Sequence, residues 1–136
     1  MASLAMFAQP VVAIAFGVFI LCAETCLHAG DISGLSAWTD LPLNDWFAGG
    51  FLLYGGLRLR RDGELGRTTI AAAWGFMCSL LSAAFVDHWS EWRSATTSSD
   101  AWIPEGAFLA ILSTLLIISA LALVSTVTSD RADQSR

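Results

Sequence analysis

The sequence predicts an all-α integral membrane protein, an antiparallel bundle of four transmembrane helices built from two helical hairpins. Apolar residues make up 55% of the 136 residues and charged residues only 14%, whereas soluble domains carry about 25% charged residues. Three long stretches, 1–23, 68–86 and 106–129, contain no charged residue. Uncharged apolar runs of about 18 residues or more are typical of membrane-spanning helices. The bilayer, rather than a water-soluble core, is therefore expected to organise the fold.

The apolar runs and the polar residues between them divide the chain into four spans and their connections. We expect the spans at about 8–28, 44–60, 67–87 and 104–127. The expected connections are outer loops at 29–43 and 88–103, a cytoplasmic loop at 58–67 and a tail at 129–136. Asn44 is a suitable N-cap for the second span, and Pro104 lies where proline is favoured at the start of the fourth.

The second expected span is the shortest of the four. Only residues 46–57 are free of charge, and at about 1.5 Å per residue they cover about 18 Å of a hydrocarbon core of about 30 Å. The segment crosses the bilayer if its arginine side chains extend to one interface and Trp46 lies at the other. The alternative is a re-entrant or interfacial helix, which would place the two termini on opposite sides of the membrane.

The arginines indicate the orientation. With four spans, the central loop and both termini share one side, and that side carries six of the seven basic residues. The positive-inside rule places it in the cytoplasm. Many small bacterial inner-membrane proteins share this four-span plan, so we expect a multi-pass protein of a bacterial-type inner membrane with both termini cytoplasmic. The topology determinants in the central loop are Arg58, Arg60, Arg61 and Arg67.

Small residues recur along each span, and in lipid such residues let helix backbones approach closely. The third span carries Ala71, Gly75, Ser79 and Ala83, each four residues apart. The stripes of the first, second and fourth spans are Ala13 and Gly17; Gly49, Gly50, Gly55 and Gly56; and Gly106, Ala110 and Thr114. We expect these stripes to form the helix contacts within the bundle.

Ionisable residues gather at the expected outer ends of the first and third spans. Glu24 and His28 are four residues apart and share a helical face, and so do Asp87 and Glu91, with His88 beside them. An ionisable residue within a span indicates a functional site by default. The residues expected to converge are Glu24, His28, Asp87 and His88, together with Asp31 and Glu91.

Three interpretations of this outer cluster are open. The first is a set of hydrated interfacial groups, hydrogen-bonded to one another and to the loop backbone. The second is a transition-metal site formed by Glu24, His28, Asp87 and His88, because imidazole and carboxylate groups from two helices suit zinc, iron or copper. The third is haem b held between His28 and His88, because bis-histidine ligation requires two histidines on different spans near the same leaflet.

The distribution of tryptophan suggests an interaction surface. Five of the six tryptophans are expected on the outer side: Trp38, Trp46, Trp89, Trp92 and Trp102. Exposed aromatic residues with a polar rim suit a partner surface. No nucleophile set is spaced for catalysis, and no basic patch carries interleaved aromatic residues, so we expect neither an enzyme nor a nucleic-acid-binding protein.

Our preferred hypothesis is a non-catalytic subunit or accessory of a larger membrane complex. It would contact the lipid bilayer and either other membrane-protein subunits or further copies of itself. The alternative is a haem- or metal-binding membrane redox protein that uses His28 and His88 with Glu24 and Asp87.

Overall fold

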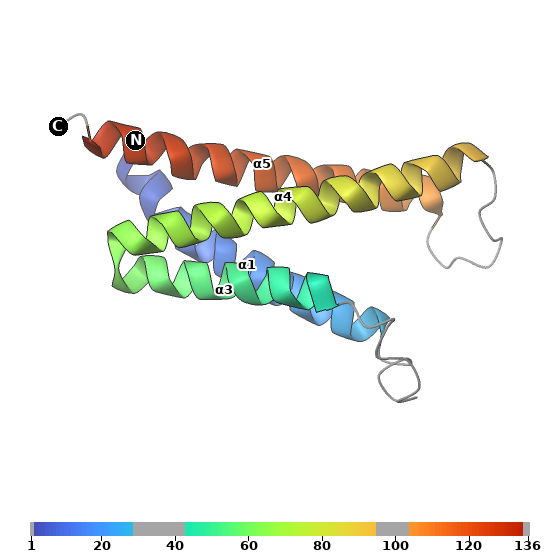
Figure 1. The fold of residues 1–136 in the computed structure, drawn as a ribbon, viewed down its shortest axis with the longest axis horizontal. Helices are drawn as coiled ribbons and strands as arrows, with labels where there is room; N and C mark the ends of the chain where they lie inside the picture. The colour runs from blue at the N-terminus through green and yellow to red at the C-terminus, as the bar shows by residue number, and fades with distance from the viewer. Residues whose placement is uncertain (1, 29–42, 95–103, 135–136) are drawn as a thin grey trace.

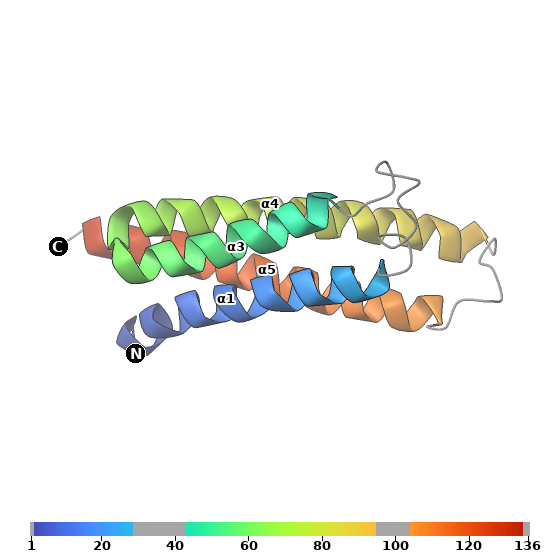
Figure 2. The same cartoon turned by 90° about the horizontal axis from the view of Figure 1, so that it is seen from below.

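Four long helices form the described part of the computed structural model, which covers residues 2–28, 43–94 and 104–134. The helices are α1 (Ala2–Leu27), α3 (Leu43–Arg61), α4 (Gly63–Ser94) and α5 (Glu105–Gln134). Figures 1 and 2 show the four helices running lengthwise through the molecule, with α1 tilted against the others and both ends of the chain at the same end of the bundle as the α3–α4 turn. For these residues, the predicted all-helical architecture with four helices is confirmed.

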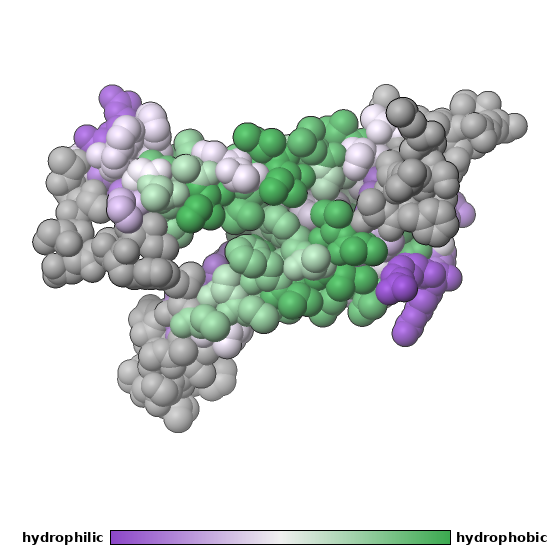
Figure 3. All heavy atoms as spheres, turned by 180° about the vertical axis from the view of Figure 1, so that it is seen from behind, coloured by the Kyte–Doolittle hydropathy of each residue, from purple (hydrophilic) through white to green (hydrophobic). Residues whose placement is uncertain are grey.

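Three of the helices are long and apolar enough to cross a membrane, within Gln9–Cys26, Gly63–Ser94 and Glu105–Thr128. They correspond to the first, third and fourth predicted spans and support the prediction of a membrane protein. Figure 3 shows apolar residues forming the broad middle of the molecule and hydrophilic residues towards its two ends. The remaining helix, α3, carries an acid in its first turn and three arginines in its last, and it packs against both α1 and α4.

The α3–α4 turn is shorter than the loop predicted at 58–67. α3 continues to Arg61 and α4 begins at Gly63, so Asp62 is the one non-helical residue between them. Its carboxylate Oδ1 accepts a hydrogen bond from the backbone N–H of Leu65 at 3.3 Å, as an N-cap residue does. At the other boundaries, α4 extends to Ser94 and α5 to Gln134, while residues 29–42 and 95–103 of the predicted outer loops lie outside the described residues.

Glycines bring α1 and α3 into backbone contact. A Cβ atom added at Gly17 would lie 2.6 Å from the carbonyl oxygen of Gly49, and one added at Gly56 would lie 3.0 Å from the carbonyl oxygen of Pro10. The distance at Gly17 is too short for a side chain, and a side chain at Gly56 would require α1 to shift. Gly17, Gly49 and Gly56 of the predicted stripes therefore form a helix contact between α1 and α3. Of the remaining second-span stripe, Gly55 packs against Ile70 of α4, and a Cβ atom added at Gly50 would meet nothing within 4 Å.

Large side chains fill the space where α4 meets its neighbours. Trp74 is 1% exposed, and its ring meets that of Phe16 of α1 edge-on, with 5.4 Å between the centroids. Leu52 of α3 and Ile70 of α4 are fully buried beside them. The core thus joins α1, α3 and α4, and α5 adds Leu112 to it.

The stripe predicted on α4 faces away from this core. Ser79 and Ala83 are exposed, and a Cβ atom added at Gly75 would meet nothing within 4 Å. α4 instead buries its bulky face, which includes Trp74 and Met77, on the opposite side of the helix. The stripe on α5 is also turned outward, at Gly106, Ala110 and Thr114. The expectation that all four stripes pack within the bundle is therefore wrong for α4 and α5.

Gly66→Ala is expected to destabilise the α3–α4 turn, because the added Cβ atom would overlap the backbone of Leu59. Rotation of a side chain cannot relieve a backbone overlap, so we expect the free energy of unfolding to fall by about 1–3 kcal/mol. Unfolding of the purified protein by SDS titration in mild detergent measures this loss. Gly63→Ala is the matched control, since a Cβ atom there meets nothing within 4 Å, and an equal loss in both variants would contradict this role for Gly66.

Candidate functional site

Two groups of ionisable side chains lie at the end of the bundle opposite the α3–α4 turn. The first, the α1–α3 cluster, consists of Glu24, His28 and Asp45. The second, the α4–α5 cluster, consists of His88, Glu91 and Glu105. Each cluster belongs to one helical hairpin. This division decides which of the predicted site residues can act together.

The α4–α5 cluster is centred on the imidazole of His88. Its Nδ1 lies 2.8 Å from Glu105 Oε1, a hydrogen bond between the two helices, and 3.6 Å from Glu91 Oε2. His88 and Glu91 are three residues apart and so share a face of α4, while Glu105 is in the first turn of α5. The His88 ring also meets the Phe108 ring edge-on, with 4.6 Å between the centroids. These contacts fix the orientation of the imidazole against α5.

The α1–α3 cluster lies where α1 ends and α3 begins. The His28 Nδ1 atom is 3.1 Å from the backbone carbonyl oxygen of Glu24 and 3.6 Å from its carboxylate Oε2. Asp45, in the first turn of α3, is close enough for its charge to act on Glu24 and His28. The cluster therefore holds two carboxylates and one imidazole.

The structure places the predicted metal and haem ligands in two groups rather than one. His28 has its contacts with Glu24, and His88 has its contacts with Glu91 and Glu105. Asp87 is exposed, and Asp31 lies outside the described residues. Figure 1 shows the outer ends of α1 and α3 diverging from those of α4 and α5. A haem held between His28 and His88 would require these two hairpin ends to approach each other.

Sequence reasoning left two residues out of the clusters, Asp45 in the first turn of α3 and Glu105 in the first turn of α5. The sequence indicates only an acidic residue in the first turn of the fourth span, where it favours the helix N-terminus. In an antiparallel hairpin, however, the start of α5 lies level with the end of α4, so Glu105 and His88 lie at the same depth. That register is the signal that could have identified the pair.

The predicted tryptophan surface is present only in part. Trp89 and Trp92 near the end of α4 are exposed. The Trp89 ring stacks on Phe85 with 6.0 Å between the centroids, and the Trp92 ring meets Trp89 at a tilt with 5.1 Å between the centroids. Trp46 is half-buried, and its indole N–H has no hydrogen-bond partner among the described residues. Trp38 and Trp102 lie outside the described residues.

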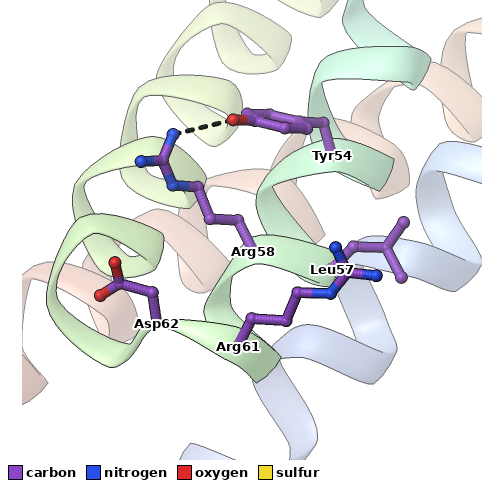
Figure 4. Close-up of a pocket in the computed structure, with 5 residues that line it drawn as sticks. All are labelled: Tyr54, Leu57, Arg58, Arg61 and Asp62. Carbon is purple, nitrogen blue, oxygen red and sulfur yellow. Dashed lines mark hydrogen bonds between the residues drawn. The ribbon is translucent and has the colours of Figure 1, made fainter.

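The predicted topology determinants lie at or next to the α3–α4 turn: Arg58, Arg60, Arg61 and Arg67. Arg58 donates a hydrogen bond from Nη1 to the Tyr54 hydroxyl at 2.8 Å, and its guanidinium carbon is 5.8 Å from the centre of the Tyr54 ring. Figure 4 shows these two residues together with Leu57, Arg61 and Asp62 around a surface hollow. The turn therefore presents a basic surface at the end of the bundle opposite both carboxylate clusters.

Comparison with protein-family models, with curated proteins and with solved structures finds no match for this chain. Its chemistry must therefore be inferred from the side chains themselves. The α4–α5 cluster offers an imidazole nitrogen and two carboxylate groups that can share a proton or a cation. The outward faces of α4 and α5 offer apolar surfaces for lipid or for another helix.

Glu105→Gln is expected to weaken the α4–α5 hairpin more than Glu91→Gln does. The Glu105 side chain is 13% exposed and hydrogen-bonded to His88. Loss of its charge should therefore lower the free energy of unfolding by about 1 kcal/mol. The Glu91 side chain is 59% exposed, and loss of a solvent-screened charge there should cost less than about 0.5 kcal/mol. SDS titration in buffer containing EDTA compares the two variants. Equal losses would contradict the central place given to the His88–Glu105 hydrogen bond.

Proposed function

We propose that this protein is a non-catalytic subunit of a larger membrane complex and that α4 carries its contact surface for a partner helix. The observation that carries the proposal is the outward-facing stripe of Ala71, Gly75, Ser79 and Ala83. Small residues at this spacing let two helix backbones approach closely in lipid, where apolar burial alone provides little driving force between helices. Within the described residues, no helix of this chain covers the stripe, so a helix of another chain is the occupant that it suits.

The position of α5 supports the same role. α5 packs along α4 but meets α1 only weakly, at a point that includes the hydrogen bond from Gln9 Nε2 to Ser125 Oγ at 3.1 Å. The hairpin of α4 and α5 therefore presents most of its apolar surface outward, including Ile117 and Leu121 of α5. Lipid satisfies such large apolar side chains, whereas the small residues of α4 gain van der Waals contacts only from a closely fitting helix.

The proposed orientation places the α3–α4 turn and both chain ends in the cytoplasm. The unequal distribution of charge between the two ends of the bundle supports this orientation. The arginines lie at the turn, and the two carboxylate clusters lie at the opposite end. Cytoplasmic segments near the ends of membrane spans carry an excess of arginine and lysine. A bacterial-type inner membrane is the compartment that we propose for this arrangement.

Gly75→Leu tests the contact surface. Purified from its native membranes in mild detergent, the unaltered protein is expected to elute as a complex whose protein mass, measured by light scattering, exceeds the 14.5 kDa of one chain. The leucine side chain would hold the partner backbone away from α4, and we expect at least a tenfold loss of association, about 1.4 kcal/mol. The internal fold should remain intact, because a Cβ atom at Gly75 meets nothing within 4 Å.

Ala120→Leu is the matched control for this experiment, since it makes a similar change at an exposed position of α5. We expect it to leave the complex unchanged. A free monomer of the unaltered protein, or equal dissociation by both variants, would refute the proposal. Identification of the co-purifying chain by mass spectrometry separates a second copy from a different subunit.

Neutralisation of Arg58, Arg60 and Arg61 to glutamine tests the orientation. With the three charges removed, the arginine asymmetry falls from six against one to three against one, and we expect a mixed population of orientations. Labelling of a cysteine introduced near the C-terminus with a membrane-impermeant reagent measures the fraction on each side. Arg93→Gln, at the opposite end of α4, should leave the orientation uniform, and a uniform orientation in the triple variant would contradict the role of the turn.

A further inference from the structure

His88, Glu91 and Glu105 bring three metal-ligating groups together at the outer end of the α4–α5 hairpin. One donor atom from each residue lies within 4.8 Å of the other two. The donors are one imidazole nitrogen and two carboxylate oxygens, a set that divalent transition metals accept. Because His88 and Glu91 come from α4 and Glu105 comes from α5, an ion bound to all three would link the two helices.

The distances among these atoms are close to those of a metal site. Ligands about 2.0–2.1 Å from a tetrahedral zinc ion are about 3.4 Å apart. His88 Nδ1 is 3.6 Å from Glu91 Oε2 and 2.8 Å from Glu105 Oε1, values that bracket that separation. To seat an ion, the shorter contact would open by about half an ångström, and the two carboxylate oxygens, which lie within 4.8 Å of each other, would take up a similar separation. A change of this size needs only side-chain adjustment.

The charges of the three groups also favour a dication. Two carboxylates face one imidazole, so His88 can neutralise at most one of their two negative charges even when it is protonated. The Glu105 side chain is largely buried, which raises the cost of leaving charge unbalanced there. A divalent cation with a neutral imidazole would balance both carboxylates. We infer that His88, Glu91 and Glu105 form a site for a divalent transition-metal ion such as zinc.

The surrounding residues hold two of the ligands in place. The Phe108 ring packs against His88, and Glu105 is fixed at the start of α5 beside Pro104. Glu91 completes the set from an exposed position one turn beyond His88 on α4. Three protein ligands leave one position of a tetrahedral ion for water or for a group from outside the protein.

This ligand set differs from the one that the sequence suggests. His88 is common to both, but Glu91 and Glu105 replace Glu24, His28 and Asp87, because those three residues belong to the other hairpin or face solvent. The inference is independent of the proposed subunit role, since the two use different faces of α4. A negative result for either one leaves the other standing.

Zinc binding by the purified full-length protein tests the site. After EDTA treatment and its removal in mild detergent, zinc is titrated against a chromophoric chelator, and bound zinc is counted by elemental analysis. We expect one tightly bound zinc ion per chain and at least a tenfold weaker affinity in Glu91→Gln. Glu91 is the informative residue because its exposed side chain contributes little to folding, so its loss should weaken zinc binding without unfolding the hairpin.

Two control variants separate this site from the other carboxylates. Asp87→Asn removes the charge next to His88 but no proposed ligand, and His28→Asn alters the α1–α3 cluster. Both should bind zinc with the affinity of the unaltered protein. Less than one zinc ion per chain, an unchanged affinity in Glu91→Gln, or an equal loss in Asp87→Asn would overturn the inference. Loss of the ion in His28→Asn alone would assign it to the α1–α3 cluster instead.

Discussion

Backbone contact through the glycines of α3 is the constraint on which the rest of the structure depends. α3 is the least apolar of the four helices and is not itself long and apolar enough to count as a membrane span. Gly49 brings it against α1, and a Cβ atom at Gly55 would lie only 3.1 Å from the Cα atom of Ile70 in α4. With glycines facing both neighbours, α3 packs closely between α1 and α4, although few of its own side chains could hold it there by hydrophobic burial.

The outer end of the bundle is divided between the two hairpins. α3 packs against both α1 and α4, from the α3–α4 turn as far as the contact between the Phe47 and Phe76 rings, whereas α5 is held mainly by α4. Away from the turn, the two hairpins follow different directions (Figure 1). His28 and His88 each contact a carboxylate of their own hairpin. The polar contacts at this end therefore form within each hairpin.

The positions of the helices can be predicted well from the sequence, because long uncharged apolar runs occur where a helix crosses the bilayer. The sequence also predicts the contact of α1 with α3 because glycine and alanine dominate one face of each helix. It does not predict which face of α4 is buried, since both the bulky face with Trp74 and the small-residue face with Gly75 are apolar and lipid tolerates either. The His88–Glu105 hydrogen bond depends on hairpin register, and the one-residue turn at Asp62 depends on a backbone contact at Gly66. Neither the hydrogen bond nor the short turn can be predicted from a local pattern in the sequence.

The two faces of α4 connect the two proposals. Gly75 and His88 are thirteen residues apart, which at about 100° per residue puts them on roughly opposite sides of the helix. His88 is directed towards α5, and the small-residue stripe is directed away from the core. An ion held by His88, Glu91 and Glu105 would fix α4 to α5 without obstructing the stripe. The burial of Trp74 and Met77 by itself gives α4 the rotation that turns Gly75 outward. The ion would add a second tie between α4 and α5 without being required for that rotation, because the two sets of residues lie on different faces of the helix.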